Sequence, residues 1–174
     1  KGQVVEGLAA IDEAMAAAAS GQLGPRTTGR IYCNMMSTCE NLADYRRASE
    51  WNEAARAWCE PHSQSGFPGI CRVHRAQLLR LRGSWPEAEI EARQASEELE
   101  DFLSDVAAEA YYELGEIKML TGDLVGADNY FRQAHELGRD PVPGLALLRL
   151  AQGRKESARA LLERCGPIAG TTAN

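Results

Sequence analysis

Two pairs of cysteine and histidine are the residues whose types and spacing best suit chemistry in this sequence. Cys59 and His62 form one Cys-x-x-His pair, and Cys71 and His74 form a second. Four such ligands could complete a tetrahedral zinc site, with the segment between the pairs closing it. However, structural zinc sites use paired Cys-x-x-Cys, and both cysteines fall in helical patterns that bury small residues. We therefore favour buried thiols over zinc, and we expect no cofactor.

Sequence signatures of catalysis are missing. The chain contains neither the phosphate-binding pattern GxxxxGK[ST] nor the GxGxxG, HExxH and GxSxG patterns. Its three histidines leave little material for a catalytic triad. The sequence therefore predicts a protein that is not an enzyme.

The densest basic feature is a group of arginines: Arg46, Arg47, Arg72, Arg75, Arg80 and Arg82. At helical spacing these side chains do not all share one face. We favour an arrangement in which their stems cover apolar helix surface and their heads pair with Glu87, Glu89 and Glu91. The alternative is a patch that binds an acidic partner segment. The formal net charge of −6 argues against direct contact with nucleic acid.

The composition indicates which elements must position these residues. The 174 residues include 27 alanines, whereas aromatic residues make up only 6%. Alanine has the highest helix propensity, so an all-α fold is expected. We place a single domain at residues 1–167, followed by a flexible tail at 168–174. No apolar run is long enough for a membrane span, and five cysteines without a CxxC pair suit a reducing cytoplasm.

A short turn motif recurs along the chain. A small residue, a polar residue and usually a large apolar residue precede an alanine, in segments that begin at Ala43, Gly83, Gly122 and Gly153. A small residue recurs seven positions after each of these alanines and, in most copies, twelve positions before it. Small residues at such positions let two antiparallel helices approach closely. The pattern predicts helices at 3–19, 28–42, 46–59, 68–82, 86–100, 104–121, 124–138, 143–152 and 155–165.

These residues resemble the tetratricopeptide repeat (TPR), a helical hairpin that stacks into a right-handed superhelix. The residues that carry the resemblance best are Tyr111, Leu114, Gly115, Gly122, Asp123, Leu124, Ala127, Phe131 and Ala134. The resemblance covers about four hairpins preceded by a half-repeat. A narrower resemblance rests on Tyr32-Cys33, Trp58-Cys59, Cys71-x-Val73-His74 and Gly83-x-Trp85-Pro86. These segments are similar to helical-repeat regions of large actinobacterial transcriptional regulators that join an ATPase module to a LuxR-type helix-turn-helix domain.

The TPR resemblance implies a groove lined by the first helix of each hairpin. The groove positions correspond to Arg30, Asn34, Ser37, Asn41, His74, Gln77, Arg80, Tyr112, Glu113, Glu116 and Met119. Chaperone-binding members of the family clamp a terminal carboxylate with basic and amide side chains. Here the clamp positions are occupied by Cys33, Ser37, His74, Glu109 and Glu113, and the two carboxylates would repel such a ligand. Binding of a chaperone tail is therefore not expected.

Three functions remain open at this point. The first is a non-catalytic interaction or sensor module of a larger transcriptional or signal-transducing regulator, which contacts a protein or an adjoining domain of its own chain. The others are a free-standing adaptor that docks a partner peptide and a sensor that binds a small molecule near Tyr112 and Met119. The first predicted helix either caps the stack or exposes a face. Exposed ends of a stack also favour self-association, so a homodimer is a further expectation.

Overall fold

The structure is a computed structural model that describes residues 3–59, 67–100 and 104–164. These ranges contain helices and no strand, which confirms the all-α prediction. The helices are α1 (Val4–Ala19), α2 (Pro25–Asn41), α3 (Tyr45–Cys59), α4 (Phe67–Leu81), α5 (Trp85–Leu99), α6 (Ser104–Leu120), α7 (Leu124–Glu136), α8 (Gly144–Ala151) and α9 (Lys155–Arg164). The tail predicted at 168–174 lies outside the described residues.

The predicted helix ranges agree with these bounds to within about three residues. The largest difference is at α2, which begins at Pro25 although the sequence pattern placed its start at residue 28. Gly24 precedes the helix in an extended conformation, with ψ of 156°. Proline is favoured in the first helical turn because its φ is already helical and its missing N–H has no partner to lose there. Gly24 and Pro25 lie outside the predicted range, but Pro25 is the first residue of the helix and Gly24 is its N-cap.

The four predicted turns share one backbone conformation. Ala43, Gly83, Gly122 and Gly153 all have positive φ, between 56° and 85°. In each turn the next residue's N–H donates to a carbonyl five residues earlier, for example from Asp44 to Cys39 at 2.8 Å and from Ser84 to Leu79 at 3.0 Å. This bond closes a helix end in the Schellman manner. Recurring sequence therefore produces recurring geometry, and each turn reverses the chain into the next helix.

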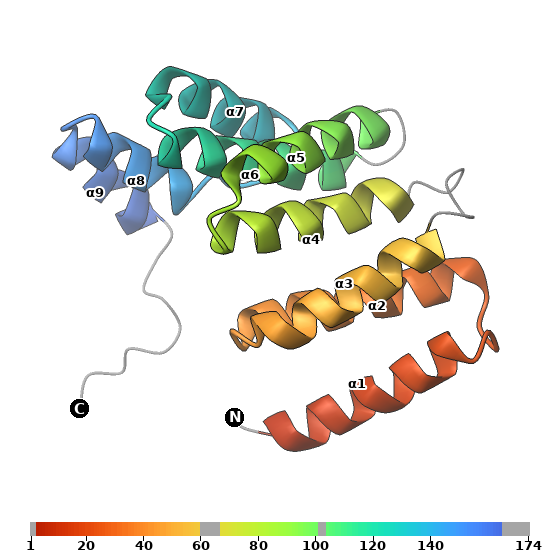
Figure 1. Ribbon diagram of the computed structural model, residues 1–174. Helices are drawn as coiled ribbons and strands as arrows, with labels where there is room; N and C mark the ends of the chain where they lie inside the picture. Colours follow the sequence, from red (N-terminus) through yellow and green to blue (C-terminus); the bar gives the residue numbers. More distant parts are fainter. Residues whose placement is uncertain (1–2, 60–66, 101–103, 165–174) are drawn as a thin grey trace.

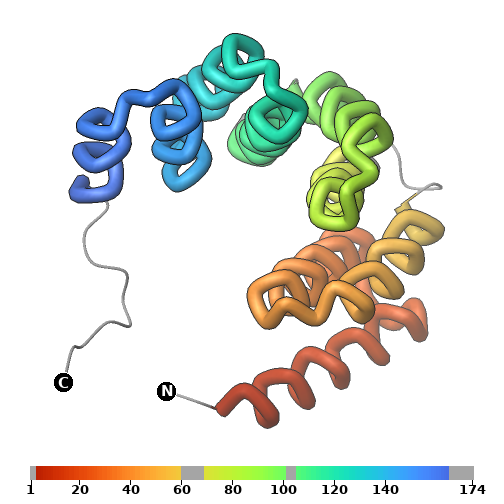
Figure 2. The backbone as a smooth tube through the Cα atoms, turned by 60° about the vertical axis from the view of Figure 1, so that its left-hand side comes forward, coloured from red at the N-terminus to blue at the C-terminus, as the bar shows by residue number. Residues whose placement is uncertain are grey.

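The helices stack in chain order along a curved path (Figures 1 and 2). The turns pair α2 with α3, α4 with α5, α6 with α7 and α8 with α9. The first helices of successive pairs also contact one another, from α2 to α4, α4 to α6 and α6 to α8. Each pair thus packs on the pair beside it, and the first helices form a continuous layer that positions the candidate site.

Small residues lie at the helix contacts, as their spacing predicted. Ala48, Ala88, Ala127 and Ala158 after the turns are at most 1% exposed. In α6 the same role falls to Gly115, where an added Cβ would lie 2.7 Å from the ring of Phe131. The large apolar side chains fill the space around these close approaches, and helix α1 adds buried Met15 to the first core cluster.

Both ends of the stack expose apolar side chains. Val5 on α1 is 82% exposed, and Leu162 on α9 is 48% exposed. Burial of Met15 and Ala18 shows that α1 covers α2 with one face and leaves another in solvent. Within the described ranges, none of the helices combines the length and the apolar character needed to cross a bilayer.

Candidate functional site

A groove between α2, α4 and α6 is the candidate site. It encloses a cavity of about 400 Å³ and contains four of the residues predicted to line a groove. Its lining residues are Ser37, Glu40, Asn41, Ile70, Val73, His74, Gln77, Val106 and Glu109. The polar side chains supply hydroxyl, amide and carboxylate groups, whereas Ile70, Val73 and Val106 provide apolar surface. Such a mixture suits a ligand that has both polar and apolar groups.

His74 links α4 to α2 at one side of this groove. Its Nδ1 lies 3.4 Å from Oε1 of Glu40. Burial by itself lowers the pKa of His74, but contacts with the side chains of Cys33 and Glu40 outweigh burial and raise the pKa to about 10. The imidazole is therefore protonated at neutral pH and forms an ion pair with Glu40. The amide of Gln77 lies close to the same pair, and its nitrogen donates to Glu40 at 3.1 Å in one orientation and to Glu113 at 3.4 Å in the other.

Arg80 and Glu113 form a buried ion pair between α4 and α6. Nε of Arg80 donates to Oε2 of Glu113 at 2.7 Å, and Glu116 lies 3.6 Å from another guanidinium nitrogen. Only 2% of Glu113 is exposed. Burial raises the pKa of Glu113, and the guanidinium of Arg80 opposes that shift. These three predicted groove residues thus contact one another across two helices.

Tyr112 ties α6 to the start of α8. Its hydroxyl accepts a hydrogen bond from the backbone N–H of Gly144 at 3.1 Å, and the guanidinium of Arg139 lies 4.3 Å from the centre of its ring. Burial, together with the nearby carboxylate of Glu116, raises the pKa of Tyr112 above its usual value. Met119 packs against the apolar cluster that contains Tyr112. This part of the predicted groove is filled by contacts within the protein.

The remaining predicted groove residues lie at the surface of α2. Arg30 and Asn34 are exposed, and neither belongs to the lining of the cavity. Ser37 and Asn41, which follow on the same helix, do line it. The structure therefore brings together Ser37, Asn41, His74 and Gln77, and it places the others in ion pairs, in the core or farther along the surface.

Sequence reasoning missed one carboxylate of this groove, Glu40, and named Glu109 only as a clamp position. Glu40 lies one turn after Ser37 and next to Asn41, and Glu109 lies one turn before Glu113. Helical spacing from the predicted groove positions could have indicated both as lining residues, since residues three or four apart share a face. Nε of Arg139 pairs with Glu109 at 2.8 Å, so this carboxylate is partly neutralised.

The three described members of the cysteine and histidine pairs lie in two different places. Cys59 and Cys71 are buried together, whereas His74 lies with Glu40 and Cys33, and His62 is outside the described residues. In the part of the chain that the structure describes, no three side chains from His, Cys, Asp and Glu are grouped to hold a metal ion.

The arginines of α4 pair with carboxylates, although with partners other than most of those predicted. Arg72 contacts Glu91 at 2.8 Å and Glu98 at 3.0 Å, and Arg75 contacts Glu53 at 2.8 Å. Among the three predicted acidic partners, Glu91 is the one that these two arginines contact. Residue Glu89 instead pairs with Arg93 and Lys118.

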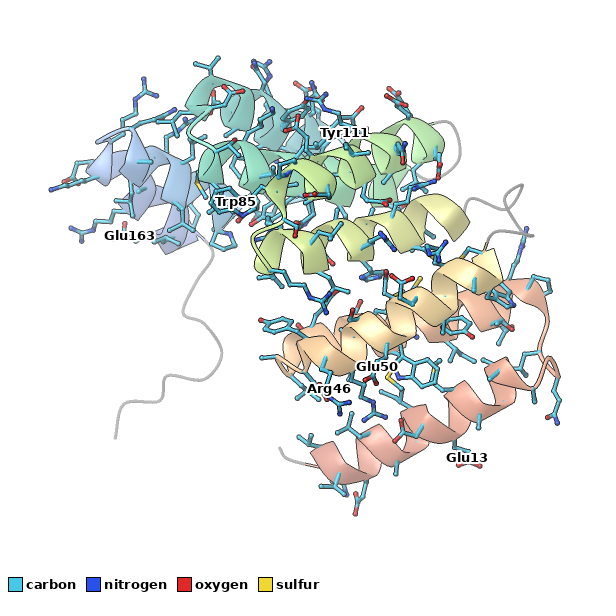
Figure 3. The ribbon with its side chains drawn as sticks, viewed as in Figure 1. Glu13, Arg46, Glu50, Trp85, Tyr111 and Glu163 are labelled. Carbon is cyan, nitrogen blue, oxygen red and sulfur yellow. The ribbon has the colours of Figure 1, made fainter. Side chains whose placement is uncertain are left out.

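Ion pairs on the outer surface differ from these partly buried ones. Arg46 and Glu50 lie together on α3 (Figure 3), where their side chains are 83% and 60% exposed. Exposed pairs of this kind contribute little to stability. The Arg46–Glu50 pair is therefore a suitable control for measuring what the buried pairs contribute to the free energy of unfolding.

A larger cavity of about 580 Å³ lies at the other end of the stack. It is formed by α7, α8 and the segment between them. Arg149 and Asp128 both line it, and they pair with each other at 2.7 Å. Arg132, His135, Asp140 and Arg164 also line this cavity, but none of the predicted groove residues does.

Comparison with known proteins adds no assignment. The sequence matches none of the protein-family models, and none of the curated proteins matches it. The geometry of the groove and the resemblance of the repeat residues are therefore the guides to function.

Proposed function

We propose that this chain is a TPR-like superhelix that acts as a non-catalytic protein-interaction or sensor module. The observation that carries the proposal is the groove between α2, α4 and α6, which is open, mixed in polarity and lined by the first helices of neighbouring hairpins. In the regulator that the sequence resembles, a segment bound there would bias a neighbouring ATPase or DNA-binding domain.

The walls of the groove are held in place before a ligand binds. The Arg80–Glu113 pair connects α4 to α6, and the His74–Glu40 pair connects α2 to α4. A preformed site loses little conformational entropy on binding, so more of the contact energy is available for affinity. Catalysis is not needed to explain any of these contacts.

The lining also favours one kind of partner. Glu40 and Glu109 line the groove beside the polar side chains of Ser37, Asn41 and Gln77. His74 pairs with Glu40 and Arg139 pairs with Glu109, but each carboxylate keeps lone pairs that can accept further hydrogen bonds. These acceptors favour N–H donors and disfavour a terminal carboxylate. The partner that fits is therefore an internal, extended peptide segment whose backbone amides and basic side chains contact the groove. The apolar side chains of Ile70, Val73 and Val106 would pack against its apolar residues.

A peptide-library selection tests this proposal. Peptides that bind the purified protein should be enriched in basic residues, and the variant Asn41→Arg should bind them at least about tenfold more weakly because a cation then stands in the groove. The variant Glu97→Arg, at an exposed position of α5, is the matched control and should bind normally. Equal binding by both variants would show that the groove is not the interaction site.

Two alternatives predict different observations. An adaptor that works alone would bind peptides in the same way, but its gene would encode no ATPase or helix-turn-helix module. A small-molecule sensor would carry a co-purifying compound, visible by mass spectrometry after mild denaturation, near Tyr112 and Met119. Because Tyr112 is buried against Phe131 and Arg139, the structure gives more support to the peptide groove.

A further inference from the structure

The thiols of Cys59 and Cys71 meet where two hairpins join. Cys59 is the last residue of α3, and Cys71 lies near the start of α4. Their sulfur atoms are 2.6 Å apart, and the two residues are 3% and 6% exposed. Non-bonded heavy atoms ordinarily stay about 3.5–4.0 Å apart, so these sulfurs are in unusually close contact. A small further approach would bring them to bonding distance.

The backbone around the two thiols is already aligned. The side-chain amide of Asn52 on α3 donates to the carbonyl oxygen of Cys71 at 3.2 Å and contacts the sulfur of Met36 at 3.4 Å. This buried contact holds the start of α4 against α3 and α2. Closing a bond between the sulfurs therefore requires little rearrangement of the helices.

A cavity adjoins this pair, and both cysteines keep slight exposure to solvent. Cys59 and Cys71 line a cavity of about 240 Å³ together with Asn52 and the arginines of α3 and α4. The other described cysteines lack such an arrangement. Cys39 contacts Met35 of its own helix at 3.6 Å, and Cys33 interacts with His74.

We propose that Cys59 and Cys71 are a reversible modification site, at which a low-molecular-weight disulfide oxidises the two thiols to an intramolecular disulfide. This inference is independent of the proposed function. The bond would join α3 of one hairpin to α4 of the next, one turn before groove residue His74. Oxidation would thus fix the packing of one hairpin against the next.

The reaction proceeds by two thiol–disulfide exchanges. One protein thiol loses its proton and attacks the small disulfide, which forms a mixed disulfide and releases one small thiol. The second protein thiol loses its proton and attacks the protein sulfur of that mixed disulfide, which forms the Cys59–Cys71 bond and releases the second small thiol. Two protein thiols are oxidised and one small disulfide is reduced. The contact with Cys59 and burial both raise the pKa of Cys71, so the exchange should be faster at alkaline pH.

The sequence makes the test direct. Trypsin cleaves after Arg56 and Arg72, so both thiols fall in one peptide, residues 57–72. The purified protein is reduced, incubated with oxidised glutathione, alkylated with N-ethylmaleimide under denaturing conditions and digested. We expect the peptide 57–72 to carry two labels before oxidation and none after it, with a mass about 2 Da below that of the unlabelled dithiol.

Three outcomes would overturn the proposal. They are two labels retained after oxidation, a lasting glutathione adduct on this peptide, and a cross-link between this peptide and residues 31–46, which contain Cys33 and Cys39. The label count needs no variant and therefore does not depend on whether a mutant folds.

Thermal unfolding provides a second readout with matched variants. Oxidation should raise the Tm of the wild-type protein by about 5–10 °C, because the bond restricts the unfolded chain. The variant Cys59→Ser should lose this increase, and the variant Cys39→Ser should keep it. An equal increase in all three proteins would assign the effect to another site.

Discussion

Replacing Arg80 with methionine should show how much the buried ion pair between α4 and α6 contributes to the free energy of unfolding. The side chain of Glu113 is 3% exposed, and that of Arg80 is 17% exposed. Methionine retains most of the volume of the arginine stem but removes the guanidinium. Glu113 and Glu116 would then face each other without their shared cation. Removal of one member of a buried pair costs about 3–5 kcal/mol of the free energy of unfolding.

The loss in the free energy of unfolding caused by Arg80→Met should depend on pH. Burial already raises the pKa of Glu113, and Arg80 opposes that shift. Without Arg80 the pKa rises further, so the carboxyl group of Glu113 takes up a proton at mildly acidic pH and the buried charge disappears. A raised acid pKa lowers stability as pH rises through it. The variant should therefore lose about 3–4 kcal/mol at pH 8 and about 1–2 kcal/mol less than that at pH 5.5.

Urea denaturation followed by tryptophan fluorescence measures these free energies, since the chain contains three tryptophans. The control is Arg46→Met, because the exposed pair of Arg46 and Glu50 should contribute less than about 0.5 kcal/mol. The double variant Arg80→Met/Glu113→Gln should recover at least about 1 kcal/mol relative to the single variant at pH 8. A loss below about 1 kcal/mol at pH 8, or the same loss at both pH values, would refute the reasoning.

Three further predictions concern the turns, the helix contacts and pH. Ala43→Gly should raise the free energy of unfolding by about 0.5–1 kcal/mol, because φ of 56° is unfavourable for alanine. Ala57→Gly, at an exposed position of α3, should instead lower it by about 1 kcal/mol. Gly115→Ala should lower it by about 1–3 kcal/mol, because the added methyl meets the buried ring of Phe131; no loss in urea denaturation would contradict that contact. The pKa of His74, raised to about 10, adds stability that is complete below about pH 6.5 and is lost as pH rises through 10. Between pH 6.5 and 8 the wild-type protein should therefore lose about 1–2 kcal/mol relative to His74→Gln, and parallel pH curves for the two proteins would disprove this.

Much of the fold could be predicted because its determinants are local. The turn residues indicated where helices end, and alanines at recurring intervals indicated where helices approach closely. The error at Pro25 arose from a residue type that serves both in loops and in first helical turns. The repeat geometry then followed from four similar turns.

The candidate site was predictable only in part. Ser37, Asn41, His74 and Gln77, which helical register placed among the groove positions, line one cavity. Register alone did not reveal that Glu113 is buried against Arg80, because that contact joins residues 33 positions apart on different helices. It also gave no sign that Cys59 and Cys71 touch.

The sequence by itself determined the helical class, the positions of the turns and the spacing of the small contact residues, because helix propensity and turn conformation are properties of short segments. The tertiary structure decided which polar side chains remain available to a ligand. That choice depends on how neighbouring helices pack, since the same arginine or glutamate can face solvent or complete a buried pair. The groove therefore depends on how neighbouring helices pack, whereas the hairpins that form it can be predicted from the sequence.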